Sequence, residues 1–246
     1  MVEETLSLST QDGDMGVHIR RPDGDGPFPV VVYFHHGPGL DDGSKESMQW
    51  LADEGYYVIS HDRYHREEPW FRFRREDRAD QDAFQRFWGI LTGTTDAMVD
   101  VDVRAVLDHV AADPAARGER LGCIGFCIGA RSVVRAMADH PDTFAAGSGL
   151  HPSFCTTDQP DSPHLAVPSI PGHLYIAYGA EDKMQAAADN VPFIDAVRAM
   201  GDRGTAEILD GADHGFAVPG DSYHEPAAKR AYDQTFAMFD RVLRSR

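Results

Sequence analysis

The chain has 246 residues, 42% of them hydrophobic and 26% charged, a composition typical of a globular enzyme and not of a disordered or fibrous chain. Its net charge of −17 argues against nucleic-acid and anionic-membrane partners, because phosphate groups would be repelled. Its apolar runs are far shorter than the roughly 20 residues that cross a bilayer. The acidic N-terminus, Met1–Glu4, is unlike the basic start of a signal peptide, so we expect a cytoplasmic protein.

The first half of the chain opens differently from the rest. Residues 4–9 and 16–21 read as two strands joined by a turn at residues 11–14, which predicts an antiparallel N-terminal hairpin. Beyond it, short β-rich runs alternate with helical patterns, the signature of a mainly parallel sheet with helices on both faces. The strands expected there are residues 28–34 and 56–60, and the helices are 44–54, 80–91 and 95–112.

The second half continues this alternation. Its expected strands are residues 121–126, 144–150, 173–178 and 205–209, and its expected helices are 128–139, 186–200 and 226–243. We find no repeat, low-complexity tract or linker, so we predict a single α/β domain over residues 1–246. Five chemically versatile residues come just after expected strand ends, where the working groups of such sheets lie: His36, Cys127, His151, Asp182 and His214.

Three cysteines, Cys123, Cys127 and Cys155, are too few and too unevenly spaced for a disulfide framework. The sequence contains no CxxC or HExxH pattern, so we expect no metal site. Cys123 lies inside an expected strand and Cys155 in a loop, and both are interpreted as passive residues.

Cys127 stands between an expected strand and an expected helix, in the run Gly125-Phe126-Cys127-Ile128-Gly129. A nucleophile at such a turn needs glycines two residues before and after it, so that strand and helix can approach closely. The Ile128 amide, at the helix start, can stabilise an oxyanion, and the helix dipole lowers the thiol pKa. Cys127 is therefore the candidate nucleophile; the alternative is a packed structural cysteine.

A thiol nucleophile needs a base, and histidine suits that role at neutral pH. In enzymes with this kind of turn the histidine comes late in the chain, after the acid. His214, after the last expected strand, fits this order, whereas His224 is interpreted as a surface residue near a helix start.

The acid should follow the strand between nucleophile and base. Asp182 occupies that place, with its neighbour Glu181 as the alternative. Asp213, next to His214, is disfavoured because adjacent side chains in a turn rarely meet. A second oxyanion amide should come from the loop after residues 28–34, where Gly37 has an N–H group and Pro38 has none. His36 and His151 either line the pocket or are hydrogen-bonded structural histidines.

Arginines and aromatic residues are concentrated in residues 63–78. One interpretation is a solvated loop that is salt-bridged to its own Glu67, Glu68, Glu76 and Asp77. The other is a rim over the active site whose arginines attract an anionic substrate.

These motifs together resemble the dienelactone hydrolase family, which uses a Cys-Asp-His triad on an α/β-hydrolase fold. The match covers most of the chain. It runs through residues 50–56, 62–64, 125–129, 179–182 and 213–216. The resemblance implies that Cys127, Asp182 and His214 form the triad and that the Gly37 and Ile128 amides bind the oxyanion.

Two departures from the family pattern concern the substrate. The family enzyme has a glutamate where this chain has His36, and a carboxylate-binding arginine where this chain has Val218. We therefore expect hydrolysis of a small-molecule ester or lactone other than dienelactone, with no cofactor, by a monomer or homodimer. The alternatives are a thioesterase or acyltransferase on the same scaffold, and a non-catalytic binding protein.

Overall fold

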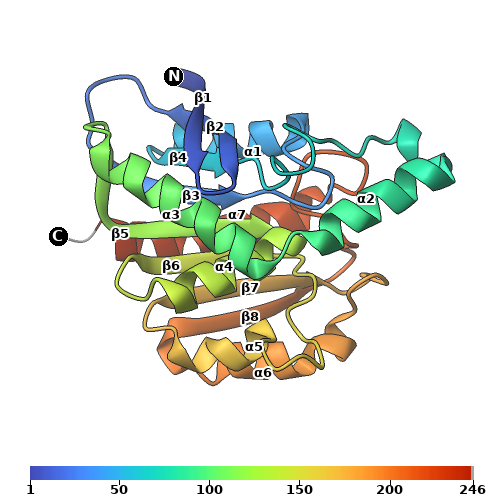
Figure 1. Ribbon diagram of the computed structural model, residues 1–246. Coiled ribbons are helices and arrows are strands. Elements are labelled where there is room, and N and C mark those ends of the chain that lie inside the picture. Colours follow the sequence, from blue (N-terminus) through green and yellow to red (C-terminus); the bar gives the residue numbers. More distant parts are fainter. Residues whose placement is uncertain (245–246) are drawn as a thin grey trace. The chain divides into compact units, whose positions relative to one another are not determined.

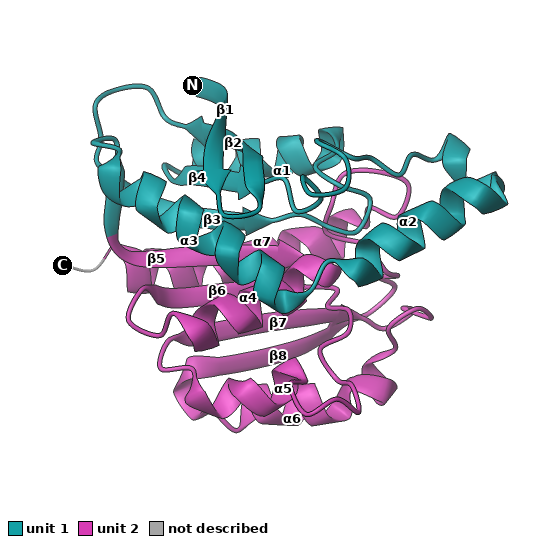
Figure 2. Ribbon diagram, viewed as in Figure 1, with its two compact units in different colours: residues 1–118 teal, residues 119–246 magenta. Residues whose placement is uncertain are grey.

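A computed structural model describes residues 1–244 of the chain. The backbone groups into two compact units, residues 1–118 and residues 119–246 (Figure 2). The prediction of one domain over residues 1–246 stays a prediction. Both units combine strands and helices, which confirms the predicted α/β class.

Unit 1 contains four strands in the order β1-β2-β4-β3. Their bounds are β1 Val2–Thr10, β2 Gly13–Arg21, β3 Phe28–Phe34 and β4 Tyr57–His61. β1 and β2 pair antiparallel, as the hairpin prediction requires, and β2 also pairs antiparallel with β4. β3 and β4 are parallel and buried along most of their length, which explains their continuous apolar sequence.

The helices of unit 1 begin at polar caps. They are α1 Asp42–Asp53, α2 Gln81–Gly93 and α3 Asp96–Ala112, with a short 3₁₀ helix, η1, at Glu76–Ala79. The side chains of Asp41, Asp80 and Thr95 accept hydrogen bonds from the first-turn amides of the three α-helices. Such caps satisfy amides that have no acceptor within the helix.

Unit 2 contains four parallel strands in the order β5-β6-β7-β8. They are β5 Ala116–Phe126, which begins at the end of unit 1, β6 Phe144–Leu150, β7 His173–Gly179 and β8 Gly204–Leu209. Because these strands are parallel, their carboxyl ends share one edge of the sheet. The loops that follow them therefore lie close together.

The helices of unit 2 cover both faces of its strands. The longer ones are α4 Ile128–Asp139, α6 Val191–Arg198 and α7 Glu225–Leu243; the short ones are α5 Pro163–Ala166, η2 Val167–Ser169, η3 Ala187–Asn190 and η4 Gly201–Arg203. α4 and α7 both pack on β6, and Figure 1 shows α4 in front of the strands and α7 behind them. This confirms helices on both faces of the sheet.

Two predicted elements of unit 2 differ from the structure. The helix expected over residues 186–200 is divided into η3 and a shorter α6, because Pro192 has no N–H group and fits only the first turn of an α-helix. β5 is longer than the expected 121–126, since its polar first half, Arg117–Arg120, hides the strand pattern.

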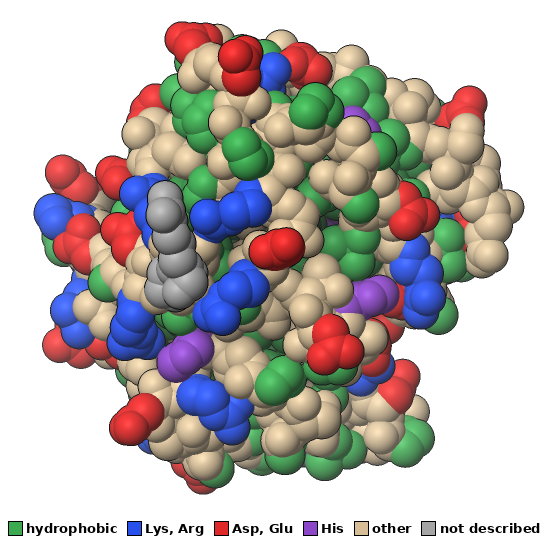
Figure 3. Space-filling view, turned by 90° about the vertical axis from the view of Figure 1, so that its left-hand side faces the viewer, with side chains coloured by type: hydrophobic (Ala, Val, Ile, Leu, Met, Phe, Trp, Pro, Cys, Tyr) green, Lys and Arg blue, Asp and Glu red, His purple; other side chains and the backbone are tan. Residues whose placement is uncertain are grey.

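Charged side chains of both signs are mixed on the face of the molecule that Figure 3 shows, and basic ones are numerous there. The net charge of −17 therefore does not make this face uniformly acidic. Among residues 1–244, none of the helices has the combination of length and apolar sequence that a membrane span requires.

Candidate active site

Four loops meet at the carboxyl edge of the unit 2 sheet, and each carries one of the residues that the sequence indicated. Cys127 follows β5 directly, His151 follows β6, Asp182 lies three residues beyond β7, and His214 lies five residues beyond β8. Their convergence follows from the parallel strand order, as expected.

Cys127 occupies a strained turn between β5 and α4. Its backbone angles, φ 54° and ψ −119°, are unfavourable for a residue with a side chain and persist only where the surroundings enforce them. Gly125 makes the turn possible, because a Cβ atom there would lie 2.2 Å from the Gly129 carbonyl oxygen. The side chain of Cys127 is partly exposed, unlike those of Cys123 and Cys155.

Ile128 is the first residue of α4. An amide in this position has no acceptor within the helix and lies at the positive end of the helix dipole. The Ile128 amide can therefore stabilise an anion that forms beside Cys127.

A close approach of two loops brings the acid and the base together. A Cβ atom on Gly179, at the end of β7, would lie 2.3 Å from the Ala212 carbonyl oxygen, so only glycine fits. The Glu181 amide donates to that same carbonyl at 2.9 Å. The loop that carries Asp182 is thus fixed against the loop that carries His214.

Both oxygens of the buried Asp182 carboxylate are occupied. Oδ1 accepts hydrogen bonds from the amides of Met184 and Gln185 at 2.9 and 2.8 Å, and Oδ2 lies 2.7 Å from Nδ1 of His214. Burial opposes ionisation of Asp182, but the interaction with His214 and the two amides outweighs it and lowers the pKa. Asp182 is therefore an ionised acceptor that can fix the orientation of the His214 ring.

The His214 ring interacts with the side chains of both Asp182 and Cys127. Burial favours the neutral ring, yet the Cys127 and Asp182 side chains outweigh it and raise the pKa of His214 to about 10. Nε2 has no hydrogen bond of normal geometry to any residue in 1–244, so it remains available for proton exchange.

The alternatives to this acid and base have other environments. Glu181 is exposed, and Asp213 turns back to accept a hydrogen bond from the His214 amide at 2.7 Å. His224 precedes α7, where its amide donates to the Phe216 carbonyl. In the described structure, therefore, Asp182 is the carboxylate on the His214 ring.

His151 packs directly against the candidate base. Its ring is fully buried and meets the His214 ring edge-on, with 5.0 Å between the centroids. Phe126 and Phe216 contact the other sides of the His151 ring. The expectation that His151 lines the substrate pocket stays a prediction; its observed contact is with His214.

Ser153 is a neighbour of Cys127 that the sequence analysis missed. Its hydroxyl oxygen lies 3.2 Å from the Cys127 sulfur. A serine in a loop has no spacing or motif that marks it, and the only available signal was its place just after the β6 strand end.

His36 and Gly37 lie in unit 1, in the loop after β3. Nε2 of His36 is 2.9 Å from Asp41, which also caps α1 through the Ser44 amide. The Gly37 carbonyl accepts a hydrogen bond from the buried hydroxyl of Tyr64 at 2.8 Å. These contacts order the loop, and the roles expected for His36 and for the Gly37 amide stay predictions.

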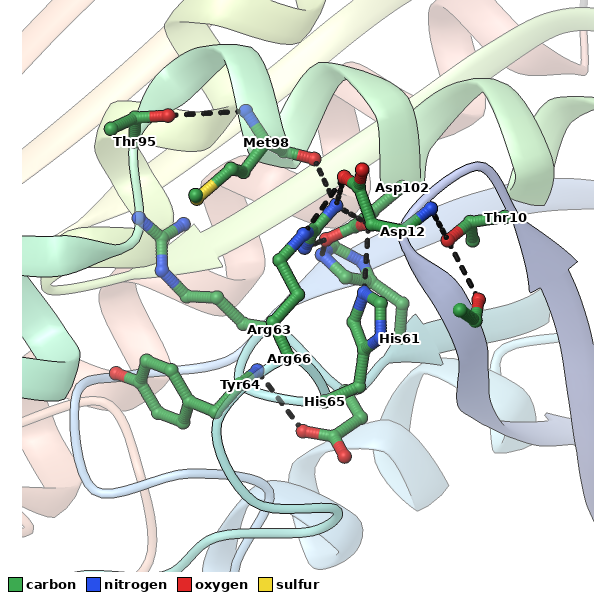
Figure 4. A network of polar contacts seen from close by, with 12 residues as sticks. Thr10, Asp12, His61, Arg63, Tyr64, His65, Arg66, Thr95, Met98 and Asp102 are labelled. Carbon is green, nitrogen blue, oxygen red and sulfur yellow. Dashed lines mark hydrogen bonds and ion pairs between the residues drawn. The ribbon is translucent and has the colours of Figure 1, made fainter.

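The arginine-rich segment 63–78 is anchored within unit 1 by residues outside the segment. Figure 4 shows Arg66 between Asp12 of the hairpin turn and Asp102 of α3, at 2.7 Å from each carboxylate. Nε2 of His65 lies 3.1 Å from the same buried Asp102. Within the segment, Arg74 lies 3.9 Å from Glu76, which is one of the expected local pairs. The rim interpretation stays a prediction.

Comparison with known proteins finds a matching family model, similar sequences and similar solved structures. A family model described as the dienelactone hydrolase family matches residues 15–243. A Salmonella typhimurium protein, provisionally named a carboxymethylenebutenolidase, is 27% identical over 242 residues, which cover 95% of this chain and 85% of that protein. The carboxymethylenebutenolidase of Pseudomonas putida is 26% identical over 130 residues, 52% of this chain and 53% of that enzyme.

A solved structure from Klebsiella pneumoniae, provisionally named a dienelactone hydrolase, superposes with a TM-score of 0.82 at 26% sequence identity. The superposition covers 97% of this chain and 98% of that one.

Proposed function

This chain belongs to the dienelactone hydrolase family, with its α/β-hydrolase fold, and we propose that it hydrolyses a carboxylic ester or lactone through a cysteine acyl-enzyme. The observation that carries the proposal is the contact between Asp182 and His214. It lies at the carboxyl edge of the unit 2 sheet, where Cys127 occupies its strained turn. Nucleophile, base and orienting acid follow one another in the chain order of hydrolases with this turn.

In the first half of the reaction the Cys127 thiolate attacks the carbonyl carbon and forms a C–S bond. The carbonyl electron pair moves to oxygen, where the Ile128 amide stabilises the charge. When the oxyanion collapses, the C–O bond breaks and protonated His214 gives its proton to the departing oxygen.

In the second half neutral His214 removes a proton from water, and the resulting hydroxide attacks the thioester. Collapse of this second intermediate releases the carboxylic acid and returns the Cys127 thiolate. Asp182 holds the ring and stabilises its positive charge in both halves. The carboxymethylenebutenolidase names of the relatives are in keeping with a lactone, but Val218 stands at the position of the family's carboxylate-binding arginine. We therefore propose a substrate without that carboxylate.

The test compares the wild-type protein with Cys127→Ala and with Cys123→Ala, which removes a buried thiol, as the control. Hydrolysis of activated aryl esters and of small lactones should be abolished by the first change and retained after the second. Mass spectrometry of the quenched reaction should find an added acyl group on the peptide that carries Cys127. Full activity of Cys127→Ala would exclude the proposed mechanism.

The same measurements separate the alternatives. A thioesterase would prefer thiol esters when a matched pair of oxygen and thiol esters is compared. An acyltransferase would need an added alcohol or amine for turnover. A binding protein would turn over none of these substrates.

A further inference from the structure

The loop after β6, residues 151–155, is buried and strained. His151 and Phe154 have positive φ values of 40° and 56°, which non-glycine residues rarely adopt. Hydrogen bonds hold both residues in place: the His151 amide donates to Ala177 at 2.8 Å, and the Phe154 carbonyl accepts from Arg131 at 2.7 Å. The Phe154 amide donates to the Gln185 side chain. Strain that the surroundings enforce in this way is typical of functional loops.

This loop attaches Ser153 to Cys127 at two points. The Ser153 amide donates to the Cys127 carbonyl at 3.1 Å, and the Ser153 hydroxyl oxygen lies 3.2 Å from the Cys127 sulfur. The serine side chain is 1% exposed. Within residues 1–244, the hydroxyl has no other hydrogen-bond partner than this sulfur. The backbone attachment fixes the distance between the two side chains, so the contact does not depend on a mobile residue.

We propose that Ser153 is a further catalytic residue, whose hydroxyl donates a hydrogen bond to the Cys127 thiolate and holds the sulfur ready for attack. The inference rests on the proposed role of Cys127 as the nucleophile. A thiolate has no proton to donate, so the hydroxyl must be the donor in this pair.

The bond acts on the resting enzyme and on the regenerated thiolate. When sulfur bonds to the carbonyl carbon it loses its charge and becomes a poor acceptor, so the hydrogen bond weakens. Ser153 therefore increases the fraction of thiolate at low pH and slightly decreases the intrinsic nucleophilicity of the sulfur, which falls with thiol pKa. A purely structural residue would not produce these two opposite effects.

The experiment measures the rate at which iodoacetamide alkylates Cys127 as a function of pH, by mass spectrometry of the peptide that carries it. Ser153→Ala should move the midpoint upward by about one pH unit, because a hydrogen bond to the charged form of a group lowers its pKa by that order. The plateau rate at high pH should stay equal to that of the wild type or rise slightly. In the pH–rate profile of ester hydrolysis, the low-pH midpoint should shift upward by the same amount as the alkylation midpoint.

The matched control is Ser162→Ala. Ser162 is equally buried and bonds to the same loop through Cys155, but it does not contact the sulfur, so the midpoint should not change. Ser153→Thr retains the hydroxyl and should keep the wild-type midpoint. If Ser153→Ala does not fold, Ser153→Gly removes the hydroxyl in its place.

An unchanged midpoint in a folded variant without the hydroxyl would overturn the proposal. Equal slowing at all pH values would also do so, because it would indicate a structural role. Alkylation measures the reactivity of the Cys127 thiol and does not require turnover of a substrate. Either result can therefore be distinguished from a failure of the proposed function, which is tested separately by the hydrolytic activity of Cys127→Ala.

Discussion

The Asp182 carboxylate lies 2.7 Å from Nδ1 of His214, although 32 residues separate them in the chain. Two backbone amides hold the other carboxylate oxygen, so Asp182 cannot rotate away without losing three interactions. The histidine ring therefore has one defined orientation, and Asp182 does not occupy Nε2, the nitrogen that exchanges protons in the proposed mechanism.

Asp182→Asn should reduce kcat strongly while the fold and KM stay close to those of the wild type. An amide cannot stabilise the imidazolium and can impose the wrong tautomer, and in a comparable triad this costs roughly 10⁴-fold in kcat. The pKa of His214 should also fall, because one of the two groups that raise it is lost. The measurement is kcat on an activated ester from pH 5 to 10. Exposed Glu181 offers the control: Glu181→Gln should change neither quantity.

His151→Ala should lower kcat by roughly two- to tenfold, because an aromatic pair contributes about 0.5–1.5 kcal/mol and the His214 ring would lose its edge-on neighbour. KM should change little if His151 acts through His214. His151→Phe keeps an aromatic ring at this position and separates packing from hydrogen bonding. If His151 acts by packing against His214, kcat of His151→Phe should lie between that of His151→Ala and that of the wild type. Wild-type kcat in the alanine variant would contradict a positioning role.

The sequence contained enough information to predict the class of fold and to select Asp182 and His214, which the structure brings into contact. Apolar runs of strand length identified β3, β4, β6 and β7, because parallel strands that are buried on both faces leave a continuous signal. The first half of β5 was missed, since Arg117, Glu119 and Arg120 have no apolar pattern. The short α5 and η2 were also missed, because segments of three or four residues have no measurable periodicity.

The candidate site could be predicted only where a residue has a motif. Gly125 and Gly129 mark Cys127, and strand ends mark Asp182 and His214. The contact of Ser153 with Cys127 depends on the positive φ values of its loop, which no local pattern encodes. The bonds of Arg66 to Asp12 and Asp102 join segments 54 and 36 residues apart, beyond the reach of sequence spacing.

Gly125→Ala should destabilise the protein by about 3 kcal/mol or more, because the added methyl group would overlap the Gly129 carbonyl and force strand and helix apart. Chemical denaturation gives the free energy of unfolding. Gly89→Ala is the control: this exposed glycine lies inside α2, and a Cβ atom there meets nothing within 4 Å. It should stabilise the protein by about 0.5–1 kcal/mol. A Gly125→Ala variant as stable as the wild type would show that the turn relaxes without cost.

The buried histidines of unit 1 should make the protein sensitive to acid. Burial lowers the pKa of His18 to about 4 and that of His35 to about 3, and it lowers the pKa of His61 well below its ordinary value. The unfolded chain binds protons on these rings from about pH 6.5 downward, whereas the folded chain does not. The stability that these neutral rings contribute is therefore fully present above about pH 6.5. It is lost as the pH falls toward the pKa values that the rings have in the folded protein.

His61 offers the sharpest test of this acid sensitivity. Neither of its ring nitrogens has a hydrogen bond to any residue in 1–244, and Asp102 lies 3.9 Å away. The neighbouring His35, Arg63, His65 and Arg66 further disfavour a positive charge on the ring. The unfolded wild-type chain binds a proton on His61 that the folded protein does not bind. His61→Phe should therefore reduce by one the difference in bound protons between the unfolded and folded states. The slope of unfolding free energy against pH should then decrease by roughly 1.4 kcal/mol per pH unit between about pH 6 and 4.

The control for this measurement is His224→Gln, a change outside the buried histidine group, which should leave the slope closer to that of the wild type. Comparison of slopes removes the contribution of the carboxylates, because they titrate in all three proteins. An identical slope in the wild type and in His61→Phe would mean that folded His61 binds its proton in the ordinary range. The Asp102 carboxylate would then compensate for the burial of the ring.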